Sequence, residues 1–126
     1  MAKQVAKAPG AGAGKVVVFA GIAPGFGAAV ASRFVRAGYN VAGLARSRQF
    51  GGQLEAELGE QGGSYKHFVC DVTETGNVAA AIDTIARDLG APSVLIYSPM
   101  KLIVKPFQNL TTDEFESVWR VTCLGA

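Results

Sequence analysis

Short apolar runs alternate with amphipathic stretches along most of this chain. The runs are continuous, as expected for parallel strands that helices cover on both faces. They lie at residues 15–20, 40–45, 65–70 and 94–97. The stretches between them have apolar side chains three or four positions apart, which is the spacing of one helical face. These predicted helices span residues 26–37, 51–60 and 75–89.

A further helix is predicted after Thr111. Thr111 and Glu114 have the spacing of a capping box, in which each side chain accepts a hydrogen bond from the other residue's backbone N–H. Apolar side chains then follow at helical spacing, and we expect them to form the inner face of the helix. This expected face consists of Phe115, Val118 and Trp119, with Thr122 beside them.

The alternation of strands and helices predicts an α/β fold with a doubly wound, Rossmann-type parallel sheet. Right-handed crossovers place the strands in the order 3-2-1-4. In this order the run at residues 94–97 becomes an edge strand, although it is apolar and has no charge or proline to discourage pairing. Because a fifth strand normally covers such an edge, we expect the fold to be incomplete on its C-terminal side.

A glycine-rich turn follows the first predicted strand, and this pattern is typical of a pyrophosphate-binding site. Gly21 allows a sharp turn, Gly25 allows the backbone to approach phosphates closely, and Gly27 allows the next helix to pack tightly. The helix N-terminus offers N–H groups and positive potential to an anion. We therefore predict that this turn, including Ile22 and Phe26, binds a dinucleotide. A purely structural turn is the alternative.

The end of the second predicted strand favours NADP over NAD. NAD sites usually have an Asp or Glu about 20 positions after the glycines to bind the ribose 2′-hydroxyl. This chain has Arg46, Ser47 and Arg48 there instead. Arg46 can form a bidentate pair with a 2′-phosphate, and Ser47 can add a hydroxyl. A solvated pair of arginines is the alternative. Arg46 also argues against S-adenosylmethionine, whose ribose hydroxyls usually bind an acidic side chain.

Two more segments are candidates for the same site. Asp71 follows the third predicted strand, where its carboxylate can accept a hydrogen bond from an adenine amino group while Val72 packs on the ring. Capping of the next helix is the alternative for Asp71. Ser98 leaves the fourth strand where the strand order reverses, and such crevices bind ligands.

Length and charge limit the classes of function. With 126 residues, of which 49% are hydrophobic, we expect one domain at residues 15–126 behind a flexible tail at residues 1–14. A net charge of +2 is too small to indicate nucleic acid or a membrane surface as a partner. No apolar stretch is long enough to predict a membrane span.

The cysteines and the single histidine carry no predicted chemistry. Cys70 and Cys123 have no metal or redox spacing, so we predict no metal site and a reducing, cytoplasmic location. We expect Cys123 to be a buried apolar residue of the last helix. His67 lies inside the third predicted strand and is expected to be a strand residue and not a catalytic base.

Together these motifs resemble the short-chain dehydrogenase/reductase family over residues 15–126. The matching positions are Gly21, Gly25 and Gly27 of its Gly-x-x-x-Gly-x-Gly motif, the pair Asp71 and Val72, and Arg46 as its NADP-selecting arginine. The resemblance implies an NADP-dependent oxidoreductase that transfers a hydride between nicotinamide and a small carbonyl or alcohol substrate. It also implies a homo-oligomer for the full-length protein.

The chain departs from the family pattern in its later part. The family's Asn-Asn-Ala-Gly loop is Tyr97-Ser98-Pro99-Met100 here, and the asparagine of its catalytic helix falls on Thr122, which becomes the candidate catalytic position. The family's serine and Tyr-x-x-x-Lys belong to a later strand and helix that this sequence lacks. We therefore expect this chain alone to be inactive and to be a fragment of the enzyme. A non-catalytic module that binds or senses NADP(H) is the alternative.

Overall fold

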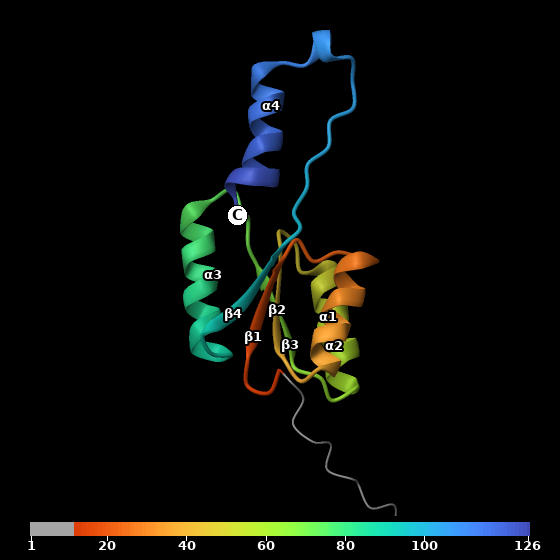
Figure 1. Ribbon diagram of the computed structural model, residues 1–126, viewed down its shortest axis with the longest axis vertical. Coiled ribbons are helices and arrows are strands. Elements are labelled where there is room, and N and C mark those ends of the chain that lie inside the picture. Colours follow the sequence, from red (N-terminus) through yellow and green to blue (C-terminus); the bar gives the residue numbers. More distant parts are fainter. Residues whose placement is uncertain (1–11) are drawn as a thin grey trace, which may run out of the picture.

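The computed structural model describes residues 12–126, which form a parallel sheet with helices on both faces (Figure 1). The strands are β1 (Val16–Ala20), β2 (Asn40–Ala45), β3 (Tyr65–Val69) and β4 (Pro92–Tyr97). The helices are α1 (Phe26–Arg36), α2 (Gln49–Glu60), α3 (Thr75–Asp88) and α4 (Thr112–Trp119), with a 3-10 turn at Phe107–Asn109 and a π-helical turn at Arg120–Leu124. The strand order β3-β2-β1-β4 confirms the predicted doubly wound sheet.

Strand β1 lies inside the sheet and is buried on both faces. Val16 and Val18 point to one face and pack in a core with Ile85 of α3. Val17 and Phe19 point to the other face, where residues of α1 and α2 cover them. Figure 1 shows the same division, with α3 on one side of the sheet and α1 with α2 on the other. The continuous apolar run of this strand is therefore explained by contact with two helix layers.

The described chain begins with a turn at residues 12–14, just before β1. The Gly12 N–H donates to the Ala37 carbonyl at the end of α1, 3.2 Å away, and the Lys15 N–H donates to the Gly12 carbonyl. Residues 1–11 of the predicted tail lie outside the described residues. Among residues 12–126, no helix combines the length and the apolar character needed to cross a membrane.

The predicted capping box at the start of α4 is confirmed. The Thr111 hydroxyl accepts from the Glu114 N–H at 3.2 Å, and the Glu114 carboxylate accepts from the Thr111 N–H at 2.9 Å. The prediction that Phe115 and Trp119 form a buried inner face of this helix is wrong, because both side chains are exposed among the described residues. Cys123 is likewise exposed and not buried. The physical reason is that α4 extends beyond the carboxyl edge of the sheet, where no second layer packs against it (Figure 1).

The packing of α3 gives a testable stability difference. Ile85 is 0% exposed and Ile82, on the same helix, is 36% exposed. We expect Ile85→Ala to lower the free energy of unfolding by about 2–5 kcal/mol, because it removes buried methyl groups and leaves a cavity. The matched control Ile82→Ala is expected to cost at most about 1 kcal/mol. Urea unfolding measures both, and equal losses would contradict the described core.

Candidate functional site

A cleft of about 690 Å³ opens at the carboxyl edge of the sheet. The segments that follow all four strands line it, and α4 with its π-helical turn closes one side. The lining segments are residues 21–23, 44–46, 70–73 and 98–101, together with Ser117, Arg120 and Val121. Backbone hydrogen bonds join these segments, since the Gly21 N–H donates to Leu44, the Cys70 N–H to Ala45 and the Ser98 N–H to Ala20. The cleft is thus bordered by backbone of fixed position.

The glycine turn at the base of this cleft has two positions that require glycine. Gly21 has φ +84°, and a Cβ atom there would lie 2.6 Å from the Pro99 nitrogen. The missing side chain therefore lets the segment after β4 cross directly over the turn. Gly25 has φ +81° and open space where a side chain would be. A Cβ at Gly27 would meet Ile22 at an ordinary contact distance of 3.4 Å, so the helix packing expected there does not depend on glycine.

The N-terminus of α1 follows this turn without a side-chain cap. Its N-cap is Gly25, and its first turn has no acidic residue. Gly21, Ile22 and Ala23 line the cleft, whereas Gly25, Phe26 and Gly27 do not. Phe26 is exposed and packs on Phe19 with a centroid separation of 6.2 Å. Because no carboxylate offsets the helix dipole here, this end of α1 favours an anion.

Arg46 and Asp71 line the cleft from two neighbouring strand ends. The Thr73 hydroxyl donates to the Asp71 carboxylate at 2.7 Å and the Thr73 N–H donates to it at 2.9 Å. These hydrogen bonds, followed by the attraction of Arg46, lower the pKa of Asp71. The alternative that Asp71 caps α3 is wrong, because the N-cap of that helix is Glu74. Asp71 is therefore an ionised acceptor at the cleft, with Val72 beside it.

Ser47 and Arg48 lie outside the cleft lining, unlike Arg46. The Arg48 guanidinium lies 3.5 Å from the Glu55 carboxylate of α2. The Ser47 carbonyl accepts a hydrogen bond from the His67 ring, so this segment is held from the side of α2 and β3. A Ser47 hydroxyl that adds to a phosphate site stays a prediction. His67 itself is a buried residue of β3, as expected.

The segment after β4 and the π-helical turn form the opposite wall. The Tyr97 hydroxyl donates to the Val121 carbonyl, and the Lys101 N–H donates to the Thr122 hydroxyl at 3.4 Å. Ser98 and Val121 line the cleft, whereas Thr122 does not. The catalytic role of Thr122 therefore stays a prediction, and in this structure its hydroxyl ties the wall together.

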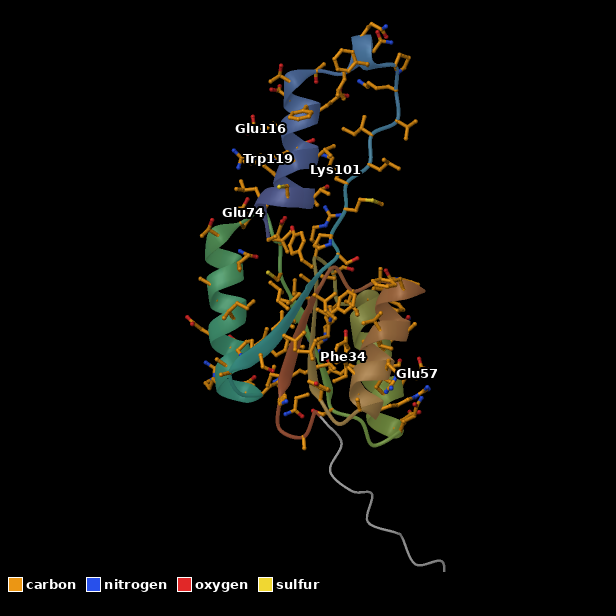
Figure 2. The ribbon with its side chains drawn as sticks, viewed as in Figure 1. Phe34, Glu57, Glu74, Lys101, Glu116 and Trp119 are labelled. Carbon is orange, nitrogen blue, oxygen red and sulfur yellow. The ribbon has the colours of Figure 1, made fainter. Side chains whose placement is uncertain are left out.

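Two cations at this wall were not predicted for the site. Lys101 and Arg120 line the cleft, and Arg120 pairs with Glu116 at 2.8 Å. Figure 2 shows Lys101 on the segment between β4 and α4, with Glu116 on α4. With Arg46, the part of the lining formed by residues 12–126 has three cations and one carboxylate, Asp71, which suits a ligand with phosphates. No spacing in the sequence points to Lys101 or Arg120, because they reach the cleft only through the fold. Among residues 12–126, no group of His, Cys, Asp or Glu could hold a metal ion.

Comparisons with known proteins agree on one family. A family model described as short chain dehydrogenase matches residues 15–126. Two curated relatives are a D-threitol dehydrogenase from Mycolicibacterium smegmatis, 30% identical over 112 residues, and a momilactone A synthase from Oryza sativa subsp. japonica, 37% identical over 114 residues. Each match covers 89% of this chain but only 43% and 41% of these relatives, so the chain spans less than half of their length.

Solved structures agree with the fold. A short chain dehydrogenase from Mycobacterium smegmatis has a TM-score of 0.84 and 28% identity, over 94% of this chain and 51% of that one. A metagenomic short-chain oxidoreductase in complex with NADP has a TM-score of 0.84 and 23% identity, over 90% of this chain and 52% of that one. The second likeness is one of fold alone.

The crossing of Gly21 by Pro99 can be tested by substitution. We expect Gly21→Ala to lower the free energy of unfolding by about 1–3 kcal/mol, because it adds strain at a positive φ and a clash with backbone. Gly59→Ala is the matched control, since Gly59 lies within α2 and has nothing within 4 Å of a new Cβ. The control is expected to be neutral or slightly stabilising. A Gly21→Ala variant as stable as Gly59→Ala would refute the close crossing.

The ion pair between Lys105 and Glu114, in the first turn of α4, gives a pH-dependent test. Hydrogen bonds from Lys105 and from Thr111 lower the pKa of Glu114 to about 2. Because the pKa falls on folding, this ionised contact stabilises the fold above the unfolded pKa and is lost as the pH falls toward 2. We expect Lys105→Met to raise the Glu114 pKa in a carboxyl-carbon NMR titration, whereas Lys101→Met leaves it unchanged. An unshifted Glu114 in Lys105→Met would contradict the ion pair.

Proposed function

Because this chain belongs to the short-chain dehydrogenase family, we propose that it is the cofactor-binding part of an NADP-dependent oxidoreductase. The observation that carries the choice of cofactor is Arg46, which lines the cleft at the end of β2. A carboxylate at that strand end would repel a 2′-phosphate, and a guanidinium can bind it through two parallel hydrogen bonds. The excess of cations at the cleft supports the same choice.

The residues that line the cleft and the adjoining start of α1 would divide the binding of NADP among them. The turn at Gly21 and Gly25, with the free N-terminus of α1, receives the pyrophosphate. The carboxylate of Asp71 accepts from the adenine amino group, while Val72 packs against the ring. When bound, the cofactor would donate a hydride to a small carbonyl substrate in its reduced form, or accept one from an alcohol in its oxidised form. Ser98 and the neighbouring wall then border the nicotinamide end.

The partners of the whole protein belong to this proposal as well. We expect a small-molecule substrate and no nucleic acid or membrane partner, because the chain has a net charge of only +2. We also expect the full-length protein to be a cytoplasmic homo-oligomer. The exposed Phe115 and Trp119 of α4 support association with a further protein surface.

A non-catalytic NADP(H)-binding module is the second candidate function. One observation favours it: the Tyr97 and Thr122 hydroxyls, at positions where the family has asparagines, are used for contacts between the two parts of the wall. Oxidation of NADPH in the presence of a panel of small aldehydes and ketones separates the two candidates. The module predicts cofactor binding without turnover in the full-length protein, and the enzyme predicts turnover.

The role of Arg46 is tested with a matched arginine. We expect Arg46→Gln to weaken NADPH binding by about tenfold to a hundredfold, because it removes a charge-assisted pair with the 2′-phosphate. NADH binding should change little, since NADH lacks that phosphate. Arg48→Gln is the control, because Arg48 lies outside the cleft lining and contacts Glu55. Calorimetric titration with both cofactors measures the effect, and equal weakening of NADPH and NADH would remove Arg46 from the 2′-phosphate site.

A further inference from the structure

His67 is buried at the centre of the edge strand β3, where only 2% of the residue is exposed. Its ring lies under α2, because a Cβ atom added to Gly51 of that helix would collide with the ring nitrogen Nδ1. Glycine within a helix costs about 0.5–1 kcal/mol relative to alanine. Gly51 therefore lowers the intrinsic stability of α2 but lets this helix approach the His67 ring closely.

The ring of His67 holds the segment between β2 and α2. Its Nε2 atom lies 3.0 Å from the Ser47 carbonyl. A carbonyl can only accept, so Nε2 carries the proton and donates. The next carbonyl along the chain, that of Arg48, accepts a hydrogen bond from the Gly52 N–H in the first turn of α2. The histidine thus binds a carbonyl just outside the first helical turn.

Glu55 of α2 joins the same set of contacts. Its carboxylate accepts from the backbone N–H of His67 at 2.8 Å and lies 3.5 Å from the Arg48 guanidinium. Two side chains therefore link β3 to α2 and to the segment at residues 46–48. The His67 ring contacts Ser47, and the Glu55 carboxylate contacts both the His67 backbone and Arg48. Burial lowers the pKa of the His67 ring and so favours its neutral form. Nδ1 has no hydrogen-bond partner among the described residues, which leaves the Ser47 carbonyl as the ring's hydrogen-bond partner there.

We propose that His67 is a positioning residue that holds Arg46 and Ser47 in the conformation that receives the 2′-phosphate, and so sets the preference for NADP(H) over NAD(H). The proposal rests on the proposed function of Arg46. Arg46 and Ser47 are both exposed and adjoin the end of β2, so their own side chains have little packing to fix them. A fixed carbonyl at Ser47 orders the neighbouring backbone before the cofactor arrives. Such preorganisation lowers the entropic cost of binding at this segment alone.

The test uses two amides that differ by one bond in length. In His67→Gln the amide nitrogen reaches about the place of Nε2 and can donate to Ser47, whereas in His67→Asn it is too short. His67→Leu removes the donor and keeps an apolar filling. Lys66→Gln is the matched control, because Lys66 lies on the other face of β3 and pairs with Asp88 at 2.7 Å.

Two measurements are made on each variant. Calorimetric titration gives the dissociation constants of NADPH and NADH. We expect NADPH to bind about threefold to tenfold more weakly to His67→Asn and His67→Leu, with NADH nearly unchanged, as for the loss of one hydrogen bond. His67→Gln and Lys66→Gln should keep the wild-type ratio. Without cofactor, backbone NMR order parameters at Arg46, Ser47 and Arg48 should fall in the Asn and Leu variants only.

The outcomes separate this proposal from the proposed function. If the wild-type chain prefers NADPH and the Asn and Leu variants keep that preference, the role of His67 is overturned and the proposed cofactor stands. Equal weakening of NADPH and NADH would also overturn it, because it indicates a structural role for the whole fold. If the wild-type chain shows no NADPH preference, the proposed cofactor fails, and with it the effect of His67 on cofactor choice. The order parameters then still decide whether the ring orders the segment.

Discussion

Strand β1 has water on neither face, and most of the arrangement around it follows from this burial. Its apolar side chains need α3 on one side and α1 with α2 on the other, and its backbone needs a strand at each edge. At the end of β1 the chain must therefore leave between β2, which continues into α2 on one face of the sheet, and β4, whose following segment runs beyond the carboxyl edge to α4. The strand order itself therefore produces a crevice at the carboxyl end of β1, whichever side chains line it.

The two sides of the crevice meet where the backbone of Pro99 closely approaches Gly21. The backbone around Pro99 can cross the turn only while position 21 has no side chain. This contact links the segment that would bind pyrophosphate to the wall that includes Lys101 and the end of α4. A side chain added at position 21 would therefore have to displace the backbone of this wall.

The sequence predicts those parts of the fold and site that depend on patterns among residues close together in the chain. Continuous apolar runs gave the strands, handedness gave their order, and the position of Arg46 relative to the glycines placed it at the cleft. The contacts of Lys101 with the π-helical turn and of His67 with Ser47 join residues about 20 positions apart, and no spacing rule encodes them. The exposure of Phe115 was missed because amphipathicity marks a face that can be buried and does not say what covers it.

The proposed cofactor site is held by two separate sets of hydrogen bonds, and this bears on how its specificity would be set. Hydrogen bonds of the main chain fix the glycine turn, since the N–H groups of Gly21 and Ile22 both donate to the Leu44 carbonyl. Side chains fix the segment after β2, through His67 and Glu55. A substitution can loosen the second without disturbing the first, because they share no donor or acceptor. If the proposed function holds, recognition of the phosphate at the ribose can thus vary while recognition of the pyrophosphate is kept, and the residues proposed to set the cofactor preference extend behind the cleft to His67 on the edge strand β3.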